Sequence, residues 1–334
     1  MDVVSDAIAV VRVGQPSSDR LSAYGSWCTR IEGHGGAAFH VVLEGVCWLL
    51  PDGGDPVLLR TGDAVLLPQG TGHVLSDSRV DDPATAAAAV PVDRWLAGLG
   101  AHGARGDQDA VGDQGAVGDH AAAGGHDAAG ARGPEVEMLC GKYRLDRSRT
   151  HPLLAELPEV VHLPNRVGEN TELRSAIDLL GRELHFRGPG SCLAVPSLLD
   201  LLLVYMVRAW SAEGGAGTWS AVLDDPVTAE ALRALHSDPA APWTNDTLAA
   251  RTGVSRPTLA RRFTTLVGRP PMTYLTWWRL TLAATRLRDT QEPLAAVARQ
   301  VGYATPYALS HAFTREFGTT PGRYREAAAR GVHV

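Results

Sequence analysis

The amino-acid sequence predicts an α+β protein of several domains. We expect an N-terminal β-barrel with appended helices, followed by an all-α C-terminal domain of two helix-turn-helix units joined by a long helix. Three observations lead to this fold class. Short apolar runs separated by turn residues fill the first eighty residues, helical periodicity begins near residue 170, and one helix-turn-helix pattern occurs twice in the C-terminal third.

The barrel is predicted from runs with strand character at Phe39–Glu44, Cys47–Leu50, Val57–Leu59 and Ala64–Leu67. Gly45, the Pro51–Gly54 stretch and the Thr61–Asp63 stretch punctuate them, and closely spaced strands with such turns are typical of a small barrel or jelly roll. A strand pattern returns at Val136–Leu145. We therefore assign residues 1–80 and 135–168 to the barrel.

Residues 81–134 have a different composition. Gly106, Gly112 and Gly118 open three tandem six-residue repeats that are rich in Gly and Asp. A segment with so few large apolar residues cannot bury enough surface to offset the loss of chain entropy. We expect a disordered insertion in a barrel loop; metal binding by its Asp and His residues is the alternative.

Two helices are predicted in residues 169–212, as a pair that packs on the barrel or forms a dimer interface. The first carries a helical stripe of Leu173, Ile177, Leu180 and Leu184. The second is strongly apolar, but its run from Leu198 to Val207 contains Asp200 and is too short to cross a membrane. A Gly-rich linker is expected at 213–225.

The helix-turn-helix pattern lies in residues 226–328. Leu248–Phe263 recurs as Val297–Phe313, with Gly253 matching Gly302. In the first copy Asn245 or Asp246 and then Ser255 are expected to cap the two helices, and Thr305 does so in the second. The intervening Met272–Arg288 is predicted to be a helix about 25 Å long, which suits two recognition helices about 34 Å apart.

Charge is distributed unevenly along the chain. The net charge is −6, yet residues 226–334 hold 14 Arg, no Lys and 7 acidic residues, which gives this segment +7 and leaves −13 for residues 1–225. A basic segment attached to an acidic body is typical of nucleic-acid binding confined to one end of a protein. Arg256, Arg262 and Arg315 flank the outward helix faces, where we expect them to contact phosphates.

Residues 226–328 resemble the AraC/XylS family of transcriptional regulators. The resemblance rests on Gly302-Tyr303, Ala312-Phe313, Phe317-Gly318 and Pro321 followed by Tyr324-Arg325. It implies two recognition helices, each reading one major groove of double-stranded DNA. By position it implies base contacts from Pro257, Ala260, Arg261, Tyr307, Ser310 and His311.

The N-terminal region is similar to the cupin domains that serve as sensors in one branch of that family. Residues 62–73 fit the second cupin motif, and residues 39–44 resemble the first. His40, Glu44 and His73 are therefore expected to line an effector pocket and, as two histidines and one carboxylate, to form a candidate site for a divalent metal. Ala38 occupies the place of the first histidine of the cupin pattern, which weakens the enzyme hypothesis.

We therefore expect a cytoplasmic DNA-binding regulator and not an enzyme: a homodimer that binds a small-molecule effector and contacts RNA polymerase, with no membrane partner. Two alternatives stay open. One is a metal-dependent cupin enzyme with a DNA-binding appendage. The other is a redox switch in which Cys47 and Cys140, both in predicted strands, form a disulfide.

Overall fold

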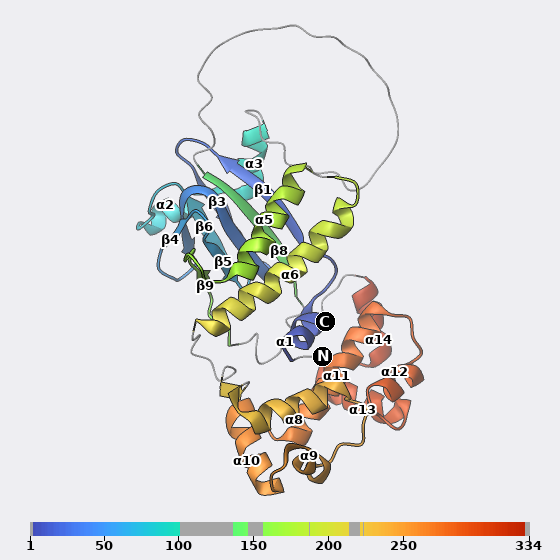
Figure 1. Ribbon diagram of the computed structural model, residues 1–334. Coiled ribbons are helices and arrows are strands. Elements are labelled where there is room, and N and C mark those ends of the chain that lie inside the picture. The colour runs from blue at the N-terminus through green and yellow to red at the C-terminus, as the bar shows by residue number, and fades with distance from the viewer. Residues whose placement is uncertain are drawn as a thin grey trace. The chain divides into compact units, whose positions relative to one another are not determined.

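The computed structural model describes residues 3–100, 136–145, 156–186, 188–213, 221–222 and 224–330. The tandem repeats and most of the predicted insertion lie outside these residues. The chain divides into two compact parts (Figure 1). We call residues 16–142 and 162–202 the barrel domain, and residues 1–15, 143–161 and 203–334 the helical domain.

A curled sheet forms the barrel domain. Its strands run in the order β1-β8-β3-β6-β2-β7, while β4 pairs with β3, and β5 pairs with both β3 and β9. The strand bounds are β1 Ser17–Ala23, β2 Cys28–Ile31, β3 Gly36–Pro51, β4 Val57–Arg60, β5 Ala64–Leu67, β6 His73–Ser76, β7 Val90–Pro91, β8 Val136–Arg144 and β9 Val161–Leu163. The cupin-like sheet of the sequence prediction is confirmed.

One long strand, β3, replaces the two strands expected at 39–44 and 47–50. Its residues 38–41 pair with β5 and its residues 46–49 pair with β4. Between these segments Gly45 has φ +85°, a left-handed conformation that glycine adopts at little cost. The strand bends there and continues, so it belongs to both halves of the curled sheet.

The beginning of the expected insertion is ordered, which corrects the predicted boundary at residue 81. It forms α2 Pro83–Ala87, β7 and α3 Val92–Gly100. Asp82 caps α2 by accepting from the N–H groups of Ala84 and Thr85, and Trp95 stacks on Trp27 with ring centroids 5.5 Å apart. Helices this short have too few turns to show a periodic pattern, which explains why the sequence did not indicate them.

The two helices predicted after the barrel are α5 Thr171–Phe186 and α6 Ser191–Ala212. The stripe of α5 is buried, and α5 lies against β1, where Arg20 donates to the carbonyl of Gly181 at 3.2 Å (Figure 1). The apolar run at Leu198–Val207 was expected to be too short to cross a membrane. The whole of α6, however, could span one by its length and composition. One such helix is weak evidence for a span, because core helices pass the same test.

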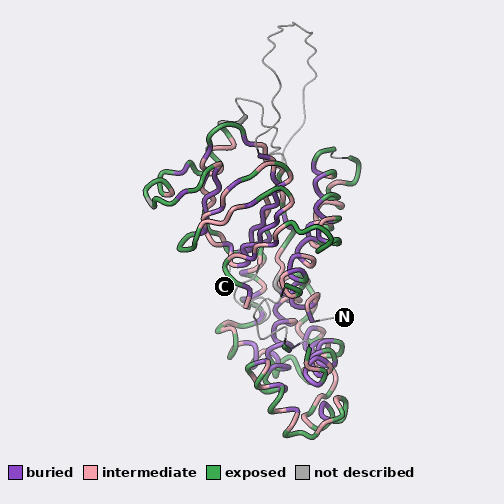
Figure 2. Tube along the Cα trace, turned by 60° about the vertical axis from the view of Figure 1, so that its left-hand side comes forward, coloured by how far each residue is buried: buried purple, intermediate pink, exposed green. Residues whose placement is uncertain are grey.

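The helical domain has an apolar interior beneath polar outer faces, and Figure 2 shows this alternation of purple and green along its helices. Its C-terminal helices are α8 Pro226–Ser237, α9 Asn245–Thr252, α10 Arg256–Val267, α11 Pro271–Asp289, α12 Leu294–Gln300, α13 Pro306–Phe317 and α14 Pro321–Ala329. The long helix expected at 272–288 is confirmed as α11. The domain also contains α1 Val3–Val11, which contacts α8 and α11, whereas the sequence analysis assigned these residues to the barrel.

Candidate DNA interface and the buried histidine network

Local capping builds the first helix-turn-helix. Helix α9 ends at Gly253, whose φ of +69° closes the helix, and Ser255 caps α10 by accepting from the N–H of Thr258. The cap of α9 is Thr244, which forms a reciprocal capping box with Thr247. The expected caps Asn245 and Asp246 are instead the first two residues of the helix.

The second helix-turn-helix repeats this construction with one tighter contact. Thr305 caps α13 by accepting from the N–H of Ala308, and Gly302 has φ +83° in the turn before it. A Cβ at Gly302 would lie 2.8 Å from Ala240 Cα and 2.9 Å from the guanidinium carbon of Arg279. Glycine is therefore required here both for its backbone conformation and for the close approach of its neighbours.

Helix α10 presents the expected outward face. Leu259 and Phe263 are buried, and Val267 takes the inward place expected of Leu266, which is only half-buried. On the other side Pro257 and Arg261 are exposed and Ala260 is half-buried. The Arg261 guanidinium has no hydrogen bond or ion pair with any described residue, so it is free to bind an external acceptor.

Helix α13 repeats this division. Leu309 and Phe313 are buried, Tyr307 is 80% exposed, His311 is exposed and Ser310 is half-buried. Phe313 stacks on Phe317, with ring centroids 4.1 Å apart. The outward residues of both helices are thus held on well-packed supports, as a binding surface requires.

The flanking arginines differ from Arg261 in their partners. Arg256 pairs with Asp246 at 3.2 Å, and Arg262 pairs with Asp225 at 3.4 Å. Both arginines are about half exposed or more, and exposed pairs of this kind contribute little to stability. Phosphates can replace these carboxylates at low cost.

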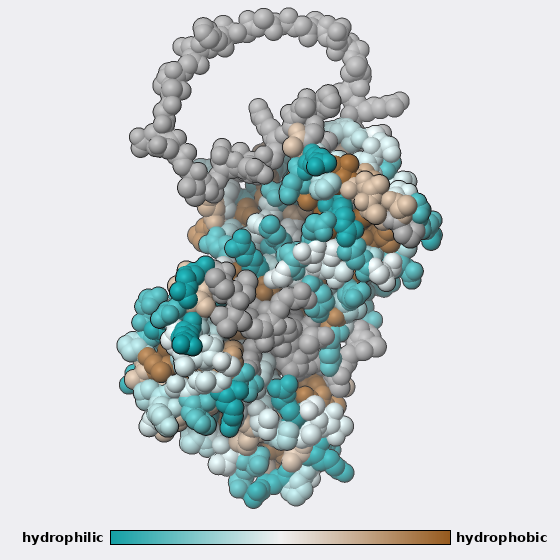
Figure 3. Space-filling view, turned by 180° about the vertical axis from the view of Figure 1, so that it is seen from behind, coloured by the Kyte–Doolittle hydropathy of each residue, from teal (hydrophilic) through white to brown (hydrophobic). Residues whose placement is uncertain are grey.

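Figure 3 shows mostly teal and white side chains on the face of the helical domain that it draws.

In the barrel domain, His40 and His73 face each other, with their Nε2 atoms 2.8 Å apart. The backbone carbonyl of Thr71 can only accept, so the Nδ1–H of His73 donates to it over 2.9 Å. In a neutral His73 the Nε2 then accepts from the Nε2–H of His40. This leaves the Nδ1 of His40 to accept from the thiol of Cys140, 3.0 Å away.

The electrostatics of this network agree with that proton assignment. Burial lowers the pKa of His40 well below its ordinary value, with a further reduction from His73, and burial also lowers the pKa of His73. Burial raises the pKa of the Cys140 thiol well above its ordinary value. The two imidazoles are thus neutral and the thiol is protonated. With this assignment, each polar hydrogen in the series from Cys140 through His40 and His73 to Thr71 has an acceptor.

Glu44 does not join the histidines, which corrects the three-residue site expected from the sequence. Alternation along β3 puts it on the face of His40, but its side chain is exposed whereas His40 is buried. Among the described residues no group of three or more His, Cys, Asp or Glu side chains is placed to hold a metal ion. Two nitrogens on one tetrahedral ion would be about 3.3 Å apart, farther than the Nε2 atoms here. The residues do not fit a divalent metal.

The acidic residue of the second cupin-like motif, Asp63, has a structural role that the sequence analysis missed. Its buried carboxylate accepts from the N–H groups of Arg60 at 2.9 Å and Asn165 at 2.7 Å, and it lies 3.3 Å from His162 Nε2. The carboxylate thereby joins the β4–β5 turn to the chain after β9. Its position three residues after Arg60 is the signal that could have indicated a turn cap.

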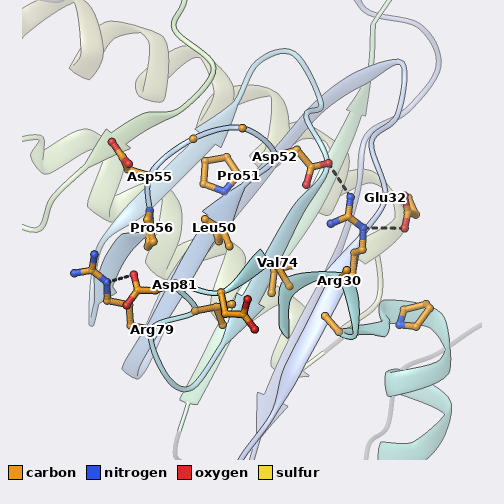
Figure 4. A pocket seen from close by; sticks show the side chains of 18 residues that line it. Arg30, Glu32, Leu50, Pro51, Asp52, Asp55, Pro56, Val74, Arg79 and Asp81 are labelled. Atoms are coloured by element: carbon orange, nitrogen blue, oxygen red, sulfur yellow. Dashed lines mark hydrogen bonds and ion pairs between the residues drawn. The ribbon is translucent and has the colours of Figure 1, made fainter. Parts of the chain in front are cut away.

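A cavity of about 790 Å³ opens in the barrel domain, and Figure 4 shows the side chains that line it. Leu50, Val74 and Val80 contribute apolar surface, and charged side chains lie around it. Arg30 pairs with Asp52 at 2.8 Å and Glu32 at 3.1 Å, and Arg79 pairs with Asp81 at 2.6 Å. The lining also contains Asp55 and Asp82, giving five carboxylates against two guanidinium groups.

Comparison with known proteins identifies the family. A family model described as Cupin matches residues 2–212, and one described as Helix-turn-helix domain matches residues 248–327. The chain is 35% identical to an AraC-like transcription regulator of Streptomyces lividans over 98% of both chains, and 33% identical to one of Streptomyces antibioticus over 98% and 99%. The chain belongs to the AraC-like transcription regulators. It is a DNA-binding regulator and not an enzyme.

Two further matches are more distant or shorter. The RCS-specific transcriptional activator RclR of Escherichia coli is 27% identical over 86% of this chain and 84% of its own. A solved structure of the DNA-binding domain of AdpA with a target DNA is 33% identical, covering 32% of this chain and 96% of that chain with a TM-score of 0.30.

The thiols of this AraC-like regulator are expected to be unreactive inside the barrel. Burial, with a smaller contribution from Asp63, raises the pKa of Cys47 to about 12, and Cys140 is protonated and donates to His40. Because the thiolate is the nucleophile, maleimide at pH 7.5 should modify exposed Cys192 in the folded protein, and Cys47 and Cys140 only after denaturation. Peptide mass spectrometry reads the sites. Modification of Cys140 as fast as Cys192 would restore the redox-switch hypothesis.

Proposed function

We propose that α10 and α13 each enter a major groove of double-stranded DNA. Base contacts are then made by Pro257, Ala260, Arg261, Tyr307, Ser310 and His311, and phosphate contacts by Arg256, Arg262 and Arg315. The observation that carries this proposal is the repeated geometry of the two motifs. In each, a capped second helix buries its Leu and Phe and turns the proposed base-contacting residues outward. The local charge of +7 supports contact with phosphates.

The regulator is proposed to act as a homodimer through α5 and α6. Leu179 and Phe186 of α5 are 45% and 76% exposed, and Leu193 of α6 is 78% exposed. Only 33% of the most apolar window of α6 is buried, although its mean hydropathy is 1.8. Exposed apolar surface of this kind favours association with a second copy. A monomer in sedimentation experiments at micromolar concentration would exclude this proposal.

The effector is proposed to bind in the barrel cavity. His40 and His73, expected at the mouth of the pocket, are 3% and 1% exposed, and both ring nitrogens of each have partners. The cavity borders them through Asp52, whose N–H donates to Gly72 at 2.8 Å, next to His73. Its apolar surface and surplus of carboxylates favour a small apolar molecule that carries a positive charge.

A matched pair of ligands tests this assignment. Phenylethylammonium should raise the melting temperature of the barrel domain at millimolar concentration, whereas 3-phenylpropanoate, of similar shape and opposite charge, should not. Asp55→Asn should reduce the shift because Asp55 lines the cavity and has no ion pair with a described residue. Asp93→Asn is the control, since this exposed carboxylate lies outside the lining. Equal shifts by both ligands would contradict a site that selects cations.

Two further expectations follow from DNA binding and concern the cell. Access to the genome requires the cytoplasm in a bacterium, and control of transcription implies contact with RNA polymerase. Both are proposals that rest on the family and on the basic recognition surface. Detection of the polymerase in a cross-linked complex on the operator would support the second.

A further inference from the structure

The first helix of the chain lies in the interior of the domain that reads DNA. Val3, Asp6, Ala7 and Val10 of α1 are all buried, at the three- and four-residue spacing of a helical stripe. The stripe contacts α8 and α11 (Figure 1). Ala9, on the opposite side of α1, is exposed.

A buried polar chain fixes α1 in place. Asp6 Oδ2 lies 3.0 Å from His236 Nδ1, and His236 Nε2 lies 2.7 Å from the hydroxyl of Tyr274. The His236 ring also stacks on Trp278, with centroids 4.2 Å apart. A buried histidine–carboxylate contact has definite geometry and is costly to break on one side only. This contact joins residues 230 positions apart, so it aligns α1 with one register of α11.

The contacts continue along α11 in the same direction. The hydroxyl of Thr285 donates to the carbonyl of Val10 at 3.3 Å, and Arg288 Nη2 donates to the carbonyl of Arg12 at 3.1 Å. The last carbonyls of a helix have no partner within the helix, and here side chains of α11 supply one. Helix α1, about 14 Å long, is therefore bonded directly to the C-terminal part of α11 and reaches Tyr274 through His236.

Helix α11 joins the two helix-turn-helix motifs. Its length and straightness determine how far apart and at what relative angle α10 and α13 are held, and both recognition helices must match successive turns of DNA. A helix packed along α11 stiffens this connection.

The end of α1 is joined to a strand that continues into the barrel. The N–H of Val13 donates to the carbonyl of Arg144 at 2.9 Å, and Arg12 forms a β-bridge with Leu145. Arg144 is the last residue of β8, the strand that also carries Cys140 of the histidine network. A change in the position or order of β8 thus reaches α1 through adjacent backbone.

We propose that α1 is a brace of the DNA-binding domain: its packing along α11 is needed for full operator affinity, and its attachment to β8 lets the barrel regulate that affinity. The surface under α1 matches it closely, since Ala7 is fully buried and the Asp6 carboxylate meets His236, whose ring stacks on Trp278. Loss of α1 would leave His236 and its apolar neighbours open to water. An isolated fragment starting at residue 226 lacks this helix.

Two substitutions of the same kind on one helix test the brace in the full-length protein. Ala7→Glu puts a carboxylate into the buried stripe and should release α1, whereas Ala9→Glu puts it on the exposed side. Hydrogen exchange of α1 should become fast in the first variant and stay slow in the second. Operator binding should weaken about tenfold or more in Ala7→Glu, a change that corresponds to about 1.4 kcal/mol, and less than twofold in Ala9→Glu.

Exchange in strands β3 and β5 serves as the internal control for folding of the barrel. If Ala7→Glu does not fold, Asp6→Asn provides a milder change, which removes the charge facing His236 and should weaken binding severalfold. Release of α1 with unchanged operator affinity would overturn the proposal. Slow exchange of α1 in Ala7→Glu would overturn it as well, because the stripe would then not be packed as described.

Discussion

Replacing Gly302 with alanine is expected to destabilise the second helix-turn-helix by about 2–5 kcal/mol and to abolish specific DNA binding. The left-handed backbone costs a residue with a Cβ about 1–2 kcal/mol. The added methyl group would also lie 2.8 Å from Ala240 Cα, which cannot move aside as a flexible side chain can. Arg279 is equally constrained, because it donates to the carbonyls of Pro239 at 2.7 Å and Ala241 at 2.8 Å. Overpacking of this kind costs about 1–3 kcal/mol more.

Gly253→Ala provides the matched control in the first motif. Gly253 has φ +69°, but a Cβ there meets no atom within 4 Å. Only the backbone penalty of about 1–2 kcal/mol applies, so this variant should remain folded and bind DNA. Chemical denaturation monitored by tryptophan fluorescence measures both changes. Equal losses in the two variants would mean that Gly302 has no close neighbours in solution.

Replacing Arg261 with alanine is expected to relax selection at one base pair of the operator. Its exposed guanidinium has no partner among the described residues and lies at the centre of the outward face of α10, where a bidentate contact to guanine is the common use of arginine. The loss should be about 1–3 kcal/mol at that base pair and close to zero at the others. Selection from a randomised operator library, with the wild-type protein alongside, shows which position loses its preference.

The neighbouring residue gives the contrasting control. Arg262→Ala should weaken binding to all sequences alike and lower the slope of log affinity against log salt by about one. Its partner Asp225 keeps a second bond, from the N–H of Thr228 at 2.8 Å, so the cap of α8 survives the substitution. A changed base preference in Arg262→Ala with an unchanged salt slope would reverse the two assignments, and an unchanged operator in Arg261→Ala would remove α10 from the groove.

The sequence predicted the features that depend on neighbouring residues. Ser255 and Thr305 cap their helices as expected because a cap needs only the N–H group three residues ahead. Gly253 and α11 were predicted for the same reason, since left-handed φ and helical periodicity are local properties. The prediction of Asn245 or Asp246 as a cap was wrong because Thr244, with Thr247 three residues on, forms a reciprocal pair that stabilises an earlier start.

The candidate sensor site was predicted only in part. The sequence identified His40 and His73, whose rings contact each other. It identified Cys140 only as a redox candidate, whereas its thiol lies against His40. It also grouped Glu44 with them, since alternation along a strand puts residues four apart on one face. Glu44 is exposed whereas His40 is buried. The burial of each position depends on what packs against β3, which the residues of β3 alone do not specify.

By itself, then, the sequence determined the family, the doubled recognition motif, the basic character of the DNA-binding end and the strand content of the barrel. Only the tertiary structure decided that α1 packs along α11, that Asp6 meets His236, and that Gly302 accommodates Arg279. Caps, turns and periodicity involve groups within a few residues of one another, so a local sequence pattern is enough to predict them. Contacts between residues far apart depend on how complete surfaces pack, and no local pattern encodes which surface a short apolar helix will meet.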